Sequence, residues 1–189
     1  MRGLLLSALA LAACGPGKAP EVLLVLPEFR MSSVGGDKPA PFTRKELLGR
    51  VWIADFIFTS CGGPCPLLSD RLSRLRERLP PEVGLLSVTV DPETDTPERL
   101  REYARSFGAE PGRWVFLRGT TEETYRLLFA GFRQPMSTDP TAPPENRVRH
   151  STRFVLIDRD AAVRGFYDGL SDEENAAAAR DARRLLEGS

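Results

Sequence analysis

The sequence lacks features that would place it in several common classes of protein. No apolar run reaches the roughly 18 residues of a membrane-spanning helix, so the chain is not expected to cross a bilayer. Neither sign of charge is in excess, since 26 Lys and Arg residues balance 26 Asp and Glu residues. Without surplus positive charge, we expect no nucleic-acid partner. At 189 residues and 41% hydrophobic content, the chain suits one globular domain with a short appendage.

Residues that bind soft metals or react as nucleophiles are also scarce. The chain has one histidine, His150, and three cysteines, Cys14, Cys61 and Cys65. Because they are so few, the position of each can be weighed separately.

The first 13 residues have the pattern of an export signal. Residues 4–13 are apolar apart from Ser7, a length typical of a signal peptide and too short to span a membrane. Residues 11–14 (LAAC) resemble the lipobox of bacterial lipoproteins, in which the cysteine becomes the first residue of the mature chain and carries lipid. An ordinary signal peptide followed by an incidental cysteine is the alternative.

We therefore expect a lipoprotein signal peptide at 1–13, lipidation at Cys14, a tether over 14–26 and one domain over 27–189. The lipid would hold an exported domain at a membrane surface, on the outer face of the cytoplasmic membrane or in the periplasm. Such a domain is not exposed to the reducing cytosol, so the remaining pair, Cys61 and Cys65, can be oxidised.

Apolar runs and helical periodicities alternate along the rest of the chain. The pattern predicts strands at 29–31, 51–58, 83–90, 114–117, 150–157 and 163–167, helices at 67–79, 97–107, 121–129 and 172–186, and an irregular excursion, or a hairpin, at 131–148. Strands alternating with helices predict a largely parallel sheet. With a final hairpin and helix, the expected class is α/β with a central mixed β-sheet flanked by helices.

Cys61 and Cys65 lie in the segment CGGPCP, between a predicted buried strand and a predicted helix. Free N–H groups and the helix dipole stabilise thiolates at such a position. If both residues are helical, their spacing puts the sulfurs on one face, within reach of a disulfide or a shared metal ion. One alternative is a purely structural disulfide, but it would close too short a loop to stabilise the fold much. The other is a pair of buried thiols, which would not need two glycines and a helix N-terminus. We expect a functional pair.

His150 is predicted to begin a strand after the excursion, where a doubly wound sheet can bring it beside the cysteine loop. Two thiolates and a neutral imidazole form a soft ligand set that suits Cu(I), keeps Cu(II) accessible and would also bind Zn(II). Three ligands leave an open position, which suits a metal that is passed on. The alternative is that His150 is an ordinary surface or core histidine, because the sequence alone does not show that it lies near Cys61 and Cys65.

Asp91 and Asp95 lie in the loop after the second long strand, at the same sheet edge as Cys61. One interpretation is a solvated turn in which Asp95 helps to cap a helix. The other is a role in docking a partner or in supporting metal ligands.

Three segments together resemble the signatures of the Sco/SenC family. Residues 58–66 (FTSCGGPCP) resemble its T-x-C-x-x-x-C-P motif, and residues 90–97 (VDPETDTP) resemble its second signature. His150-Ser151, ahead of residues 154–158 (FVLID), resembles the third. The resemblance covers about residues 27–187, nearly the whole expected domain.

The resemblance implies a thioredoxin-like fold, membrane tethering, and copper held by Cys61, Cys65 and His150. It also implies a task, assembly of the dinuclear copper centre in subunit II of cytochrome c oxidase. An acidic residue often precedes the histidine in this family, whereas here Arg149 does, and its charge bears on copper affinity or on the choice of partner.

Two functions are compatible with these residues, and we expect a monomer for either. A copper metallochaperone would need both cysteines and His150. A thiol–disulfide oxidoreductase would need only Cys61 and Cys65, would keep the oxidase copper-site cysteines reduced for another chaperone, and would need a thioredoxin-like reductant as a further partner. A peroxiredoxin does not fit, because it places a threonine three residues before its cysteine, and Thr59 lies two before Cys61.

Overall fold

Strands occur along nearly the whole chain in the computed structural model, which describes residues 18–35 and 38–188. The strands are β1 (Leu24–Val25), β2 (Arg30–Ser33), β3 (Ala40–Thr43), β4 (Trp52–Ile57), β5 (Gly84–Thr89), β6 (Trp114–Arg118), β7 (Met136–Thr138), β8 (Val148–His150), β9 (Arg153–Ile157) and β10 (Ala162–Asp168). Eight of them form one sheet in the order β1-β10-β9-β4-β5-β6-β2-β3, and β7 and β8 form a separate two-stranded sheet.

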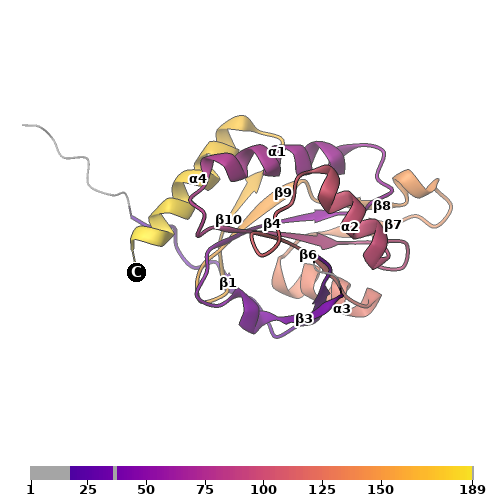
Figure 1. Ribbon diagram of the computed structural model, residues 1–189, viewed down its shortest axis with the longest axis horizontal. Coiled ribbons are helices and arrows are strands. Elements are labelled where there is room, and N and C mark those ends of the chain that lie inside the picture. The colour runs from indigo at the N-terminus through magenta and orange to yellow at the C-terminus, as the bar shows by residue number, and fades with distance from the viewer. Residues whose placement is uncertain (1–17, 36–37, 189) are drawn as a thin grey trace, which may run out of the picture.

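Helices cover both faces of the large sheet. They are α1 (Pro64–Arg78), α2 (Pro97–Ser106), α3 (Thr121–Arg126), which continues into a π-helical turn η2 (Leu127–Gly131), and α4 (Asp172–Glu187), with short 3-10 turns η1 (Arg44–Leu47) and η3 (Pro144–Asn146). In Figure 1, α1 and α4 lie above the sheet and α3 lies below it. The expected α/β class with a central mixed sheet is therefore confirmed.

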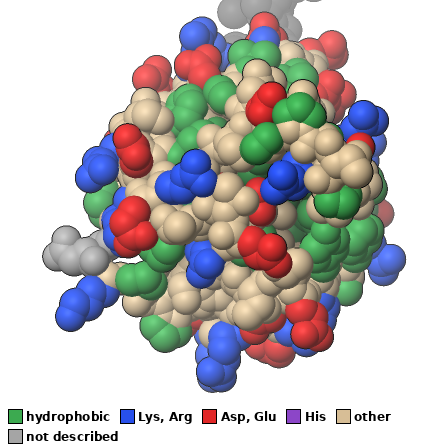
Figure 2. All heavy atoms as spheres, turned by 90° about the vertical axis from the view of Figure 1, so that its right-hand side faces the viewer, with side chains coloured by type: hydrophobic (Ala, Val, Ile, Leu, Met, Phe, Trp, Pro, Cys, Tyr) green, Lys and Arg blue, Asp and Glu red, His purple; other side chains and the backbone are tan. Residues whose placement is uncertain are grey.

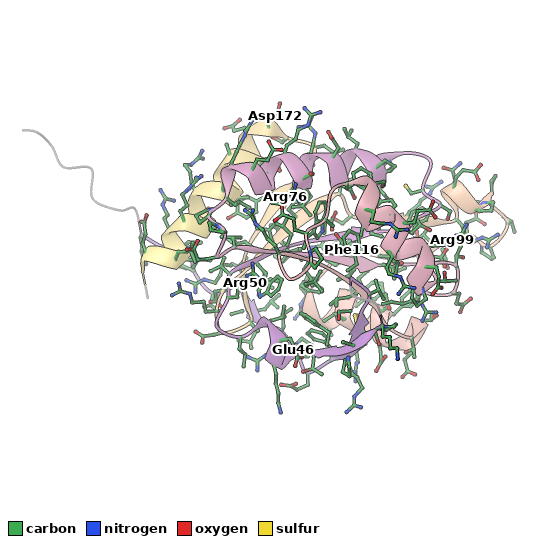
Figure 3. The ribbon with its side chains drawn as sticks, in the orientation of Figure 1. Glu46, Arg50, Arg76, Arg99, Phe116 and Asp172 are labelled. Atoms are coloured by element: carbon green, nitrogen blue, oxygen red, sulfur yellow. The ribbon has the colours of Figure 1, made fainter. Side chains whose placement is uncertain are left out.

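The central strands β4, β5 and β6 are parallel to one another, and their neighbours in the sheet are antiparallel. Every residue of β4 and β5 is buried, as expected for parallel strands with helices or loops over both faces. Phe116 of β6, in the middle of the molecule in Figure 3, is fully buried among them. The carboxyl ends of β4 and β5 consequently meet at one edge, where the cysteine loop and the 91–95 loop emerge.

The excursion contains a hairpin, but His150 does not begin the strand that follows it. His150 is the last residue of β8, and β9 starts at Arg153 after a break at Ser151 and Thr152. The break is stabilised locally, since the Ser151 hydroxyl accepts a hydrogen bond from the Arg153 N–H at 3.1 Å. The prediction of one strand over 150–157 was wrong for this reason, and β1 and β3 were not predicted.

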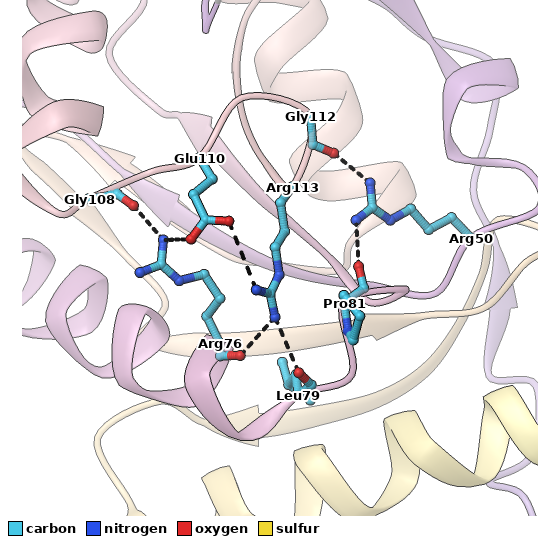
Figure 4. Close-up of polar contacts among 8 residues, drawn as sticks. All are labelled: Arg50, Arg76, Leu79, Pro81, Gly108, Glu110, Gly112 and Arg113. Atoms are coloured by element: carbon cyan, nitrogen blue, oxygen red, sulfur yellow. Dashed lines mark hydrogen bonds and ion pairs between the residues drawn. The ribbon is translucent and has the colours of Figure 1, made fainter.

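An arginine cluster closes the end of the sheet opposite the cysteine loop (Figure 4). Glu110 forms ion pairs with Arg76 at 3.5 Å and Arg113 at 4.0 Å, which links the end of α1 to the loop before β6. Together with Arg50, these arginines also donate to the backbone carbonyls of Arg76, Leu79, Pro81, Glu82, Gly108 and Gly112. The cluster therefore fixes the end of α1 and the loops before β5 and β6. The cysteine loop lies at the opposite end of the sheet.

No helix in the described part of the chain is both long and apolar enough to span a bilayer. The expected signal peptide and Cys14 lie outside the described residues.

Candidate metal centre

The two cysteines occupy different kinds of backbone. Cys61 lies in the loop after β4, where its N–H donates to the Phe58 carbonyl at 3.2 Å. Gly63 is the N-cap of α1, so Cys65 is the second residue of the helix and Cys61 lies outside it. The two cysteines lie where a strand ends and a helix begins, as expected, but the condition that both are helical is not met. Pro64 starts the helix one turn too late to include Cys61.

Cys61 and Cys65 are both free and buried, and their pKa values move in opposite directions. A hydrogen bond from the Cys65 thiol, helped by the backbone N–H groups of Cys65 and Gly63, lowers the pKa of Cys61 to about 6. Donating that bond, together with burial, raises the pKa of Cys65. Near neutral pH the pair therefore holds a thiolate at Cys61 and a thiol at Cys65.

His150 lies directly against the thiol pair. Its Nε2 is 3.1 Å from the Cys65 Sγ, and its Nδ1 is 2.9 Å from the Ser151 carbonyl oxygen. Because a carbonyl only accepts hydrogen bonds, Nδ1 carries the ring proton, and the Nε2 lone pair and the Cys61 sulfur both face the single S–H of Cys65 as acceptors. Burial lowers the pKa of His150, which favours the neutral ring. The Phe58 ring meets the imidazole edge-on, with centroids 5.8 Å apart, and helps to fix its plane.

These donors fit a soft metal ion. Two sulfurs and a ring nitrogen with a free lone pair are ligands that Cu(I) prefers, and the proton on Nδ1 leaves Nε2 available. Within residues 18–35 and 38–188, no three His, Cys, Asp or Glu side chains are yet gathered as a finished ligand cluster. Cys65 contacts both of the other side chains, His150 at 3.1 Å and Cys61 through a hydrogen bond.

Asp95 is fully buried and holds the cysteine loop in place. Its carboxylate accepts hydrogen bonds from the Thr59 N–H at 3.0 Å and from the Thr59 hydroxyl at 2.5 Å, and it also accepts from the Thr89 hydroxyl. Burial raises the pKa of Asp95, and the hydrogen bonds from Thr59 and Thr89 oppose that rise. The idea of a solvated, helix-capping Asp95 was therefore wrong, and the cap of α2 is Thr96.

Asp91 plays a smaller part in the same loop. Its side chain is only half buried and accepts one long hydrogen bond, from the Thr94 N–H at 3.4 Å. Among the described residues, neither Asp91 nor Asp95 hydrogen-bonds to Cys61, Cys65 or His150. The roles of Phe58 and Thr59 were missed, although Thr59 belongs to the T-x-C motif, because their partners come from distant segments.

An open groove of about 940 Å³ lies beside His150. It runs along the β7–β8 ribbon and the adjoining ends of β9 and β10, and its lining includes Met136, Arg149, His150, Arg153 and Phe166. Figure 2 shows the end of the molecule that lies at the right in Figure 1, where positive and negative side chains are interspersed. The groove gives a partner a route to the imidazole.

The fold and the site define a thioredoxin-like domain with a reactive dithiol and an adjacent imidazole. The chain belongs to the SCO1/SenC family, whose model matches residues 24–187. It spans 47% to 67% of the length of the first three curated relatives that it matches.

Solved structures share the fold over most of this chain. A SCO1/SenC family lipoprotein from Bacillus anthracis is 31% identical, with a TM-score of 0.75, over 86% of this chain and 95% of that one. BsSco, described as a member of the Sco family of cytochrome c oxidase assembly proteins and as having a disulfide switch, is 26% identical, with a TM-score of 0.73, over 89% and 97%. Yeast Sco1 with copper bound is 27% identical, with a TM-score of 0.69, over 87% of each chain.

The opposite pKa shifts predict which cysteine reacts with an alkylating agent. In the reduced, metal-free protein, Cys61 should react with iodoacetamide at a rate that is half-maximal near pH 6, because its thiolate forms there. An ordinary thiol reaches that point at about pH 8.5. Mass spectrometry of quenched samples would locate the label. In Cys65→Ala, which removes the thiol donor, the midpoint should move upward. Preferential labelling of Cys65 would contradict the assignment.

The contacts of Asp95 predict that its replacement costs much more stability than replacement of Asp91. Asp95→Asn should lower the free energy of unfolding by about 2 kcal/mol, because buried donors lose a charged acceptor. Asp91→Asn, the matched control, should change it by less than about 0.5 kcal/mol. Urea unfolding followed by circular dichroism measures both variants. Equal losses would show that Asp95 does not anchor the cysteine loop.

Proposed function

We propose that the chain is a membrane-tethered, copper-binding assembly factor that delivers copper to the dinuclear copper centre of cytochrome c oxidase subunit II. The observation that carries this proposal is the 3.1 Å contact between the Cys65 Sγ and the His150 Nε2. A redox pair alone does not need a neutral imidazole beside its buried sulfur, but a soft metal site does. The copper in yeast Sco1 and the oxidase-assembly description of BsSco support the proposal.

Each ligand has a distinct part in receiving Cu(I) as cargo. Cys61 is already a thiolate near neutral pH, so it can bond to an incoming ion without first losing a proton. Cys65 must release its proton to become the second thiolate, and copper uptake therefore releases a proton. The His150 Nε2 supplies the third bond without losing a proton. With so few ligands, the ion can leave by stepwise exchange with the thiolates of a partner.

The proposed setting is an exported, lipid-anchored monomer. The LAAC segment ending at Cys14 and the lipoprotein from Bacillus anthracis support the anchor. A tether over residues 14–26 would let the domain reach an oxidase subunit at the same membrane surface.

A second function, thiol–disulfide exchange, is favoured by the opposite pKa shifts of the pair. The Cys61 thiolate would attack a disulfide of the oxidase subunit, forming a mixed disulfide and releasing one partner thiolate. Cys65, after losing its proton, would attack Cys61, releasing the second partner thiolate and leaving a Cys61–Cys65 disulfide. A thioredoxin-like reductant would then restore both thiols with two electrons and two protons.

His150→Ala separates the two functions, because only copper binding needs the ring. We expect the reduced variant to bind Cu(I) at least tenfold more weakly than the wild-type chain, about the lower limit for loss of a metal-site group. Dithiol exchange with a model disulfide should persist. Competition with a Cu(I) chelator measures binding, and oxidase activity of cells carrying the variant measures assembly. Arg149→Ala, which removes a neighbouring exposed charge, should still bind one copper per chain.

Two results would count against delivery as the function. If His150→Ala loses copper binding while oxidase assembly is kept, thiol exchange is the function. If the reduced wild-type chain takes up no copper, only the redox role survives. Cys65→Ser should neither bind Cu(I) nor support oxidase assembly. It therefore serves as the reference for complete loss of both properties.

A further inference from the structure

A third sulfur lies beside the proposed ligands, on the strand that pairs with His150. In the β7–β8 ribbon, Met136 is directly opposite His150. Side chains of directly opposed residues emerge on the same face of an antiparallel pair, with Cβ atoms about 4.5–5.5 Å apart. The thioether of Met136 is therefore a cross-strand neighbour of the imidazole.

The register that places Met136 there is fixed by the segment before it. Arg133 has a φ of 52°, in the left-handed region, and Gln134 is almost fully buried. The Gln134 N–H donates to the Leu128 carbonyl and its amide donates to the Phe132 carbonyl, both at 3.0 Å. A slip of one residue would put Pro135 or Ser137 opposite His150 and turn the thioether to the other face. The hydrogen bonds of Gln134 therefore hold the chain in the register that places Met136 opposite His150.

Burial decreases from the thiol pair outward to Met136. Cys65 is fully buried, whereas His150 and Met136 are half-buried and both line the groove. Of the two methionines in the described part of the chain, Met31 is buried in β2, so Met136 is the one that reaches the groove. A thioether is a soft, uncharged ligand that has no proton to lose. Such a sulfur favours Cu(I) over harder ions.

We infer that Met136 is a transient Cu(I) ligand, on the groove side of His150, that holds the ion as it enters or leaves the Cys61–Cys65–His150 site. The inference rests on the proposed copper function. In the exit step, a bond between Cu(I) and a cysteine sulfur breaks and a bond to the Met136 sulfur forms. The freed thiolate takes a proton from water. Copper stays Cu(I), so no oxidant or reductant is needed.

Met136 also packs against the hydrophobic core, so a ligand role must be separated from a packing role. Met136→Leu conserves volume and removes the sulfur, and such swaps usually cost less than about 1.5 kcal/mol. Met31→Leu makes the same change in the core, away from the groove, and is the matched control.

Selenium in place of the methionine sulfurs provides a direct readout. The full chain, produced with selenomethionine, is reduced, loaded with one equivalent of Cu(I) and measured by X-ray absorption at the selenium edge. We expect a copper neighbour at bonding distance from selenium in the wild-type chain and in Met31→Leu, and its loss in Met136→Leu. Copper scattering that persists in Met136→Leu, or is absent from a wild-type chain that holds copper, would overturn the inference.

The rate at which a soluble chelator removes Cu(I) is an independent readout. Met136→Leu should lose copper more slowly than the wild-type chain, because the chelator can then take the ion only from the Cys61–Cys65–His150 site. Met31→Leu should match the wild type. Equal rates in all three proteins would overturn the inference that Met136 is a transient ligand. They would not count against the proposed copper function. A wild-type chain that takes up no copper would overturn both.

Discussion

One contact organises this molecule, that between the buried Cys65 sulfur and the His150 ring, 85 residues apart in the sequence. Three neighbours fix the ring: the Ser151 carbonyl holds its proton on Nδ1, Phe58 makes a T-shaped ring contact with it, and β7 pairs with the strand that carries it. The unprotonated nitrogen therefore points at sulfur. With this nitrogen beside it, the thiol pair suits a soft metal ion.

The loop that carries the cysteines is also fixed by neighbouring residues. Asp95 accepts hydrogen bonds from Thr59, before the cysteines, and from Thr89 of the neighbouring strand, so the loop is tied to the sheet by a buried carboxyl group. Hydrogen bonding within the pair then divides the two buried cysteines into a thiolate at Cys61 and a thiol at Cys65. The same asymmetry would suit either proposed function, copper binding or disulfide exchange, and only copper binding would also use the imidazole.

Much of this architecture could be predicted from the sequence, because the central strands and helices are local patterns. The apolar run of β4 and the leucine spacing of α1 depend on neighbouring residues alone, and the structure places both elements within a few residues of their predicted ranges. The end of β8 at His150 could not be predicted, because it depends on pairing with β7 and on the break at Ser151 and Thr152, neither of which the local pattern of residues 150–157 shows. The burial of Asp95 was missed since Thr59 and Thr89 come from separate elements. The lipid anchor at Cys14 stays a prediction.

The most direct test of the central claim uses the fact that His150 is the only histidine. In protein labelled with ¹⁵N at histidine, nuclear magnetic resonance reports both nitrogens of this single ring. In the reduced, metal-free chain near pH 7, Nδ1 should be protonated and Nε2 should not. With one equivalent of Cu(I), the Nε2 resonance should shift strongly while Nδ1 keeps its proton. An Nε2 resonance that stays in place while the thiolates take up copper would contradict the account.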